Sequence, residues 1–149
     1  ISKAIAPMLG TFSLIALTIG YLLGIVFVPK YINQSKALAL SAILGIVFAT
    51  FAIITQGMTS IIFIILLSFA HAMMWPSIWP LSIDKLGSHT ALGSALLIMA
   101  IAGGAILPLL YGSFVDLLGG DRQLPYIMLL PCYAMIFYFS VWGHKVGKK

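Results

Sequence analysis

Five long apolar segments dominate this 149-residue sequence. They cover residues 7–28, 37–55, 60–83, 91–115 and 125–142, and short connections separate them. A helix needs about 20 apolar residues to cross the hydrocarbon core of a bilayer. Lipid offers no partners for exposed backbone groups, so each segment is expected to be helical. The sequence therefore predicts an all-α membrane protein with five transmembrane helices.

The composition excludes a soluble domain. Hydrophobic residues make up 62% of the chain and charged residues only 7%, whereas soluble domains carry roughly 25% charged residues. The formal net charge of +5 is spread over the connections and the tail. A nucleic-acid-binding protein would show a dense basic patch instead. We therefore expect a lipid bilayer as a partner and no nucleic acid.

The lysines predict the orientation of the chain. Five spans alternate in direction, which places the 29–36 connection, the 84–90 connection and the tail on one side. That side collects Lys30, Lys36, Lys85, Lys145, Lys148 and Lys149, while the other side has only Lys3 and Arg122. Loops rich in Lys and Arg face the cytoplasm. The C-terminus is therefore expected in the cytoplasm and the N-terminus outside.

One face of the third segment carries an unusual set of side chains. At about 100° per residue, five positions fall within an arc of roughly 80°; they are Ser68, His71, Trp75, Trp79 and Ser82. We call this set the polar–aromatic stripe. Sugar hydroxyls need convergent hydrogen-bonding groups, and the C–H face of a sugar ring stacks on an aromatic ring. Polar residues at membrane depth indicate a functional site, so we predict that Ser68, His71, Trp75 and Trp79 bind substrate.

Structural roles are the alternatives for the same residues. Trp79 lies close to the charged connection at Asp84 and could be an interfacial anchor. The same alternative applies less strongly to Trp75, which lies nearer the middle of the membrane. His71 could be a neutral imidazole that a neighbouring helix satisfies. Trp142, beside the tail lysines, is expected to be an anchor, and His89 and His144 are expected to be solvated.

Prolines and glycines predict bends in two of the helices. Pro76 and Pro80 interrupt the third segment, and proline removes a backbone donor from a helix. Gly103 and Gly104 precede Pro108 in the fourth segment. Broken or flexible helices recur in transporters, so we predict that these residues permit bending or gating.

Small residues at fourfold spacing predict where helices pack closely. The first segment has Gly20 and Gly24, and the second has Ser41, Gly45 and Ala49. Such positions let helix backbones approach each other in lipid. The fourth segment repeats the spacing at four positions, for which packing and bending remain equal alternatives; they are Ala100, Gly104, Pro108 and Gly112.

Enzyme signatures are missing from the sequence. The three histidines are far apart, without the H-E-x-x-H spacing of a zinc site, and there is no phosphate-binding Walker loop. We therefore expect no enzyme activity, no catalytic residue, no metal site and no cofactor. Asp84 and Lys85 are expected either to help form a cytoplasmic gate or to set the topology.

Three stretches resemble a known family. MWPSIWPLSIDKLG (74–87) and GSALLIMAIAGGAILPLLYGSFVD (93–116) resemble the tenth and eleventh helices of the fucose–galactose–glucose:proton symporters, a branch of the major facilitator superfamily. GYLLGIVFVPKYINQSKAL (20–38) is similar to the eighth helix and following loop of the bacterial glucose/galactose group, to which N-acetylglucosamine permeases are close. Fucose permeases have Gly-Arg-x-x-Gly in that helix. This chain has Gly-Tyr-Leu-Leu-Gly at 20–24, which favours the hexose group.

The resemblance implies a fold, a location and an activity. The five spans would be helices eight to twelve of a twelve-helix transporter, and residues 1–149 a partial C-terminal bundle, in agreement with the start at Ile1. The partners would be the N-terminal half and the seventh helix of the same transporter. The expected activity is uptake of a hexose or N-acetylhexosamine across a bacterial inner membrane by alternating access, coupled to H⁺ or alternatively to Na⁺.

Three other functions remain as alternatives. The same fold could export a drug or another metabolite. Export of a hydrophobic cation would favour a carboxylate in the cavity, and no span carries one centrally. A non-transporting membrane subunit could pack through the small-residue positions, although the polar–aromatic stripe argues against it. An intramembrane enzyme is the most distant alternative.

Overall fold

The computed structural model describes residues 6–146 of the chain. Lys3, Lys148 and Lys149, which contribute to the predicted orientation, lie outside the described residues. Within residues 6–146, five helical segments are long and apolar enough to cross a membrane. The predicted fold class is therefore confirmed.

The first three spans contain four helices. The first two are continuous helices, α1 (Ala6–Phe27) and α2 (Gln34–Ile54). The third is divided into α3 (Gly57–His71) and α4 (Met74–Ile83).

The last two spans are also interrupted. A 3₁₀ turn, η1 (Gly87–His89), leads into the fourth span, which is divided into α5 (Thr90–Ala100) and α6 (Gly103–Leu117). The fifth starts as the 3₁₀ turn η2 (Leu124–Met128) and continues as α7 (Leu129–Val141). A last 3₁₀ turn, η3 (Gly143–Lys145), follows α7.

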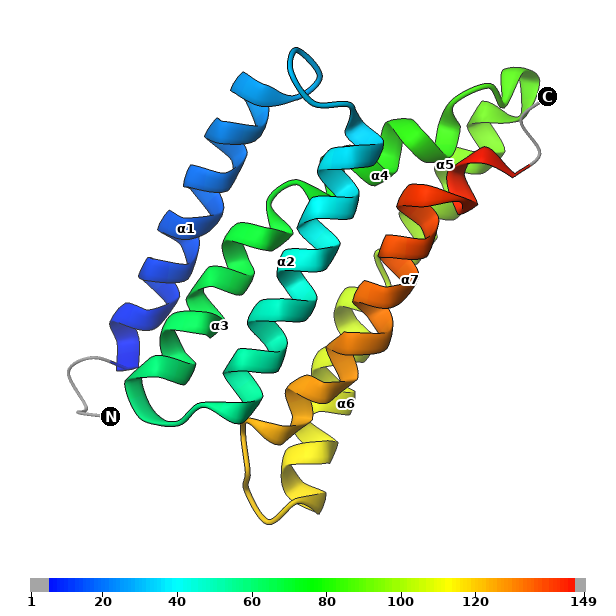
Figure 1. Cartoon of the computed structure of the whole chain (residues 1–149). Helices are drawn as coiled ribbons and strands as arrows, with labels where there is room; N and C mark the ends of the chain where they lie inside the picture. The colour runs from blue at the N-terminus through cyan, green and yellow to red at the C-terminus, as the bar shows by residue number, and fades with distance from the viewer. Residues whose placement is uncertain (1–5, 147–149) are drawn as a thin grey trace.

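The helices form a row with one span set behind it. Helix α3 contacts both α1 and α2, and α2 also packs along α7. Figure 1 shows α1, α3, α2 and α7 in this order, with α5 and α6 behind α7. The fourth span meets the row at its two ends, where α5 contacts α4 and α6 contacts η2. No residue of Gly87–Leu117 is buried within the described chain.

The buried core lies where the second, third and fifth spans meet. It is a cluster of five buried side chains that come from α2, α3, α4 and α7, namely Leu38, Ala49, Leu67, Met74 and Tyr133. Lipid is as apolar as the side chains of this cluster, so the hydrophobic effect contributes little to helix association in the membrane. Close packing and hydrogen bonds between the helices have to stabilise the cluster instead.

Glycines allow the closest approaches in the row. A Cβ atom on Gly20 would lie 2.5 Å from Ala72 Cβ and 3.0 Å from the Phe69 carbonyl oxygen. A Cβ atom on Gly24 would overlap the Met73 side chain. The Gly20 and Gly24 pair of α1 therefore packs directly against the junction between α3 and α4.

The second span uses its small residues in the same way. Ser41, Gly45 and Ala49 are all buried in α2. A Cβ atom on Gly45 would lie 2.9 Å from the Tyr133 ring. This glycine therefore gives a tyrosine of α7 its place against α2.

The junction between α3 and α4 has a local cause in the sequence. Ala72 and Met73 separate the two helices, four and three residues before Pro76. Pro76 has no N–H to donate to the carbonyl of Ala72, so the regular hydrogen-bond ladder fails at this point. Helix α4 itself continues through Pro80.

The junction between α5 and α6 shows tighter winding. The N–H groups of Gly104 and Ala105 donate to the carbonyls of Ile101 and Ala102, at 2.8 and 3.0 Å. This spacing of three residues is that of a 3₁₀ turn. Pro108 cannot donate to the carbonyl of Gly104, which adds a second irregularity one turn later.

A polar cluster fixes the connection between α6 and η2. Gln123 Nε2 lies 3.0 Å from the Ala52 carbonyl, 2.8 Å from the Thr55 carbonyl and 2.6 Å from Ser60 Oγ. The two carbonyls lie at the C-terminal end of α2, where no further N–H groups of the helix are available to donate to them. This cluster holds the start of the fifth span beside α2 and so aligns α7 with the third span.

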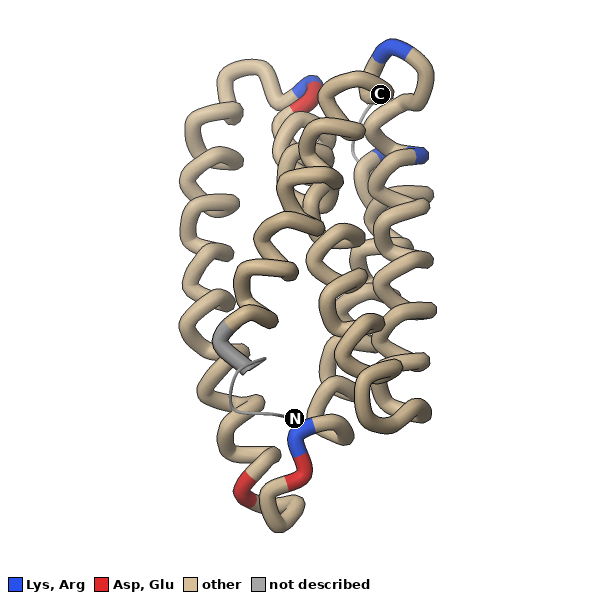
Figure 2. The backbone as a smooth tube through the Cα atoms, turned by 90° about the vertical axis from the view of Figure 1, so that its left-hand side faces the viewer, with Lys and Arg blue, Asp and Glu red and all other residues tan. Residues whose placement is uncertain are grey.

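Charged residues separate between the two ends of the bundle. One end holds the 28–33 connection, the turn after α4 and η3, with Lys30, Lys36, Lys85 and Lys145. We call it the lysine end. The opposite end carries Asp116, Asp121 and Arg122. Figure 2 shows the charges gathered at the two ends, with the uncharged spans between them.

Candidate functional site

The polar–aromatic stripe runs across the junction between α3 and α4. Ser68 and His71 belong to α3, and His71 is its last residue. Trp75 and Trp79 belong to α4. The four predicted substrate-binding residues therefore lie on both sides of the break in the third span, and any change of the angle between α3 and α4 would move the two groups relative to each other.

The two tryptophans form an aromatic pair. Their ring centroids are 5.7 Å apart and their planes are inclined at 61°. Trp75 keeps 41% of its surface exposed, whereas Trp79 is half-buried. An edge-on neighbour holds an aromatic ring in place while leaving a face accessible. Trp75 is thus the more accessible of the two rings, and the anchor role of Trp79 stays an alternative.

His71 makes a hydrogen bond to the fifth span. Its Nε2 atom lies 2.6 Å from the Tyr133 hydroxyl, and the direction of the bond depends on the imidazole tautomer. The two ring centroids are 5.7 Å apart. One ring nitrogen of His71 is therefore paired with a neighbouring helix, as the structural alternative for this residue proposed. His71 is nevertheless exposed, and its Nδ1 takes no part in this bond.

Tyr133 is a site residue that the sequence analysis missed. It is only 2% exposed and its ring lies against Gly45. Its phenol ring is therefore fixed by packing while its hydroxyl reaches His71. A tyrosine in the middle of an apolar span is a possible sequence signal, because a buried phenol usually needs a hydrogen-bond partner. The identity of that partner depends on which helices are neighbours.

The predicted bending residues lie shortly after the two helix junctions. Pro76 and Pro80 follow the first junction, and Gly103, Gly104 and Pro108 follow the second. Cβ atoms on Gly103 and Gly104 would meet no atom within 4 Å. Close packing inside the described chain therefore does not account for these two glycines. Their role in gating remains a prediction.

Asp84 and Lys85 terminate the third span at the lysine end. Asp84 caps α4, and Lys85 adopts the left-handed conformation with φ of 62°. Both residues are exposed. Their assignment to a cytoplasmic gate or to topology stays a prediction.

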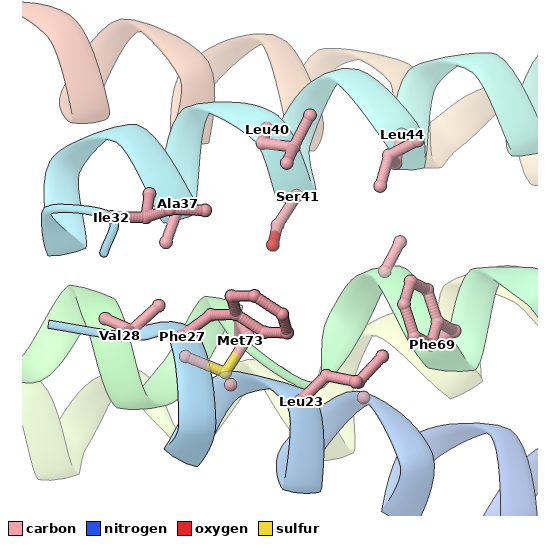
Figure 3. Close-up of a pocket in the computed structure, with 13 residues that line it drawn as sticks. Leu23, Phe27, Val28, Ile32, Ala37, Leu40, Ser41, Leu44, Phe69 and Met73 are labelled. Atoms are coloured by element: carbon pink, nitrogen blue, oxygen red, sulfur yellow. The ribbon is translucent and has the colours of Figure 1, made fainter. Parts of the chain in front are cut away.

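The pocket between α1, α2 and α3 has the wrong chemistry for a sugar. Its volume is about 140 Å³, and Phe27, Leu40 and Phe69 are typical of its apolar lining. Figure 3 shows the Ser41 hydroxyl directed into this pocket and the Met73 thioether on the opposite wall. A sugar needs several hydrogen-bonding groups, so this space suits a hydrocarbon group better.

Metal ligands are not grouped in the described part of the chain. Within residues 6–146, no three His, Cys, Asp or Glu side chains come together in a way that could hold a metal ion.

Comparison with known proteins reveals clear relatives. The chain is 35% identical over 116 residues to the glucose/galactose transporter of Brucella abortus. This match covers 78% of this chain and 28% of the relative. It is 32% identical over 124 residues to the L-fucose-proton symporter of Haemophilus influenzae, or 80% of this chain and 29% of the relative. The chain is homologous to the fucose–galactose–glucose symporter family. The family predicted from the sequence is thereby confirmed.

A further relative belongs to the same group. A Helicobacter pylori protein, provisionally named a glucose/galactose transporter, is 34% identical over 130 residues. That match covers 85% of this chain and 32% of the relative, so the chain spans about a third or less of the length of these sugar transporters. No family model and no solved structure matches the chain. Its five spans and its transporter relatives make it a multi-pass membrane protein.

Proposed function

We propose that this chain forms the last five helices of a secondary active transporter that takes up a hexose or an N-acetylhexosamine together with H⁺. The observation that carries the proposal is the homology to proteins named as glucose/galactose transporters and L-fucose-proton symporters. The polar–aromatic stripe supports it independently, because hydrogen-bonding groups and an accessible aromatic ring are what a sugar requires.

The proposed partner is the remainder of the same transporter. The matched part is 28–29% of the length of these relatives, which supports an N-terminal half and a seventh helix that complete the fold. The gathering of lysines at one end supports a cytoplasmic C-terminus in a bacterial inner membrane.

Each residue of the site has a proposed role. His71 Nδ1 hydrogen-bonds a sugar hydroxyl while Tyr133 holds the imidazole through Nε2. Trp75 stacks on the C–H face of the sugar ring, and Trp79 supports Trp75 from its edge. Ser68, half-buried on the same face of α3, adds a polar contact. Pre-positioned groups of this kind reduce the entropy that binding would otherwise cost.

Alternating access would use the two helix junctions. In transporters of this kind, two bundles rock around a site near the middle of the membrane, often next to discontinuous helices. Here the first junction, at Ala72–Met73, lies between His71 and Trp75. A change of angle at this junction would separate the hydrogen-bonding residue from the stacking residue and so release the sugar.

Uptake by the complete transporter tests the proposal. Cells that express it would be supplied with radiolabelled glucose, galactose, fucose or N-acetylglucosamine, with and without a protonophore. The proposal predicts accumulation of glucose, galactose or N-acetylglucosamine that collapses when the proton gradient is removed. Accumulation that survives the protonophore and requires sodium would replace H⁺ by Na⁺. Failure of a well-expressed protein to accumulate any of the four sugars would overturn the proposal.

A further inference from the structure

A polar pocket lies at the lysine end, where it includes Ser82, the last residue of the polar–aromatic stripe. It has a volume of about 220 Å³ and is formed between the end of α4 and η3. Its polar lining comes from Ser82, Lys85 and His144. The third and fifth spans end here, so the pocket lies at the level where a membrane helix leaves the hydrocarbon region.

The lining of this pocket is divided by chemistry. Beside the three polar residues, Leu81, Leu86 and Phe139 contribute apolar walls. A ligand that fits both parts has a compact anionic or polar group joined to hydrocarbon. Asp84, the acidic residue of the adjoining turn, is not among the residues that line the pocket.

His144 is more ordered than the solvated residue expected from the sequence. It is half-buried, and its Nδ1 lies 3.0 Å from the carbonyl oxygen of Phe139. A carbonyl can only accept a hydrogen bond, so Nδ1 carries the proton and the tautomer is defined. The centroids of the His144 and Phe139 rings are 6.2 Å apart. Nε2 takes no part in these contacts and remains available to a ligand.

Lys85 occupies a backbone position at which glycine would be easier to accommodate. Its φ of 62° places it in the left-handed region directly after the cap of α4. Glycine is the usual residue there, because a side chain strains this conformation. A lysine held in a strained backbone at a pocket is an observation that points to use of its side chain.

We propose that this pocket binds the headgroup of an anionic phospholipid. The Lys85 ammonium and the Ser82 hydroxyl donate to the phosphate oxygens, and His144 Nε2 accepts a hydrogen bond from a hydroxyl of the headgroup. The acyl chains follow the apolar side formed by Leu81, Leu86 and Phe139. Basic pockets between helix ends are known to recognise anionic lipid headgroups. The lipid would then join the third span, which carries the polar–aromatic stripe, to the fifth span, which carries Tyr133. This inference does not depend on which substrate is transported.

Native mass spectrometry of the purified complete transporter tests the proposal. The protein would be incubated with phosphatidylglycerol or with phosphatidylcholine, and the retained lipid would be counted. We expect retention of phosphatidylglycerol and little retention of phosphatidylcholine. The double substitution Lys85→Gln with His144→Gln should weaken phosphatidylglycerol binding about tenfold, because the Lys85 contact to the phosphate and the His144 contact to the headgroup hydroxyl are both lost.

A matched variant separates the pocket from general surface charge. Lys30→Gln with Lys36→Gln removes two lysines at the same end, outside the pocket, and should leave retention unchanged. Lys85→Arg keeps the charge and should retain binding, which separates loss of the charge from loss of the lysine itself. Equal loss in both double variants, or no loss in the Lys85 and His144 variant, would overturn the proposal. Displacement of the lipid by an excess of inorganic phosphate would also overturn it in favour of a soluble phosphate site.

Discussion

His71 connects the candidate site to the rest of the bundle at the scale of single residues. One ring nitrogen is 2.6 Å from the Tyr133 hydroxyl, and Tyr133 is in turn pressed against Gly45. The imidazole is therefore oriented by a side chain whose own position is fixed by packing. Tyr133 is a positioning residue in this account, because it acts on the sugar only through His71.

Replacing Tyr133 by phenylalanine tests this positioning role. The change keeps the ring packed against Gly45 and removes only the hydroxyl. Hydrogen bonds between membrane helices contribute about 0.6–2 kcal/mol. We therefore expect the KM for sugar uptake by the complete transporter to rise about threefold to thirtyfold, with the maximal rate nearly unchanged.

Tyr138→Phe on the same helix is the matched control, because Tyr138 is exposed and packs beside Trp142. Its KM should equal that of the unmodified protein. An unchanged KM in Tyr133→Phe, or equal shifts in the two variants, would remove Tyr133 from the site.

At the scale of elements, the glycines of α1 allow this helix to pack closely against the α3–α4 junction. Gly20 has no room for a Cβ atom, since Ala72 Cβ and the Phe69 carbonyl oxygen occupy that space. Neither atom belongs to a flexible side chain that could move aside. At Gly24 the obstructing atoms belong to the Met73 side chain, which can change rotamer.

Gly20→Ala should therefore destabilise the complete transporter by about 1–3 kcal/mol, the usual cost of overpacking. Gly24→Ala should cost less because Met73 can adjust. Gly10→Ala is the control in the same helix, where a Cβ atom would meet nothing within 4 Å. Unfolding of the purified protein, followed by temperature or denaturant, measures all three. Equal stability of the Gly20 and Gly10 variants would contradict the packing described for α1.

The sequence predicted the elements better than the contacts between them. Five spans follow from apolar length alone, and the break before Pro76 follows from its missing N–H. The Tyr133–His71 bond was not predicted, because it depends on α7 lying beside α2 and the third span. The Gln123 cluster at the opposite end helps to determine that placement. His144 was expected to be solvated for a similar reason, since only the fold brings it to the end of α4. Its contact with Phe139 is local, five residues back along the chain.

At the scale of the whole molecule, the described chain is an open row with one loosely attached span. The fourth span has no buried residue within the described chain, although it contains many large apolar side chains. In the proposed transporter, lipid and the remaining helices cover these surfaces. The arrangement leaves the third span, with its break and its polar–aromatic stripe, as the element best placed to couple sugar binding to movement.

Equilibrium binding of the transported sugar to the purified complete transporter, measured by titration calorimetry, tests the central claim most directly. Trp75→Ala should weaken binding about tenfold, equivalent to ~1.4 kcal/mol of lost stacking. Trp142→Ala removes an exposed tryptophan after α7 and should leave the affinity within about twofold. Unchanged affinity in a folded Trp75→Ala protein, or equal losses in the two variants, would show that the sugar binds elsewhere.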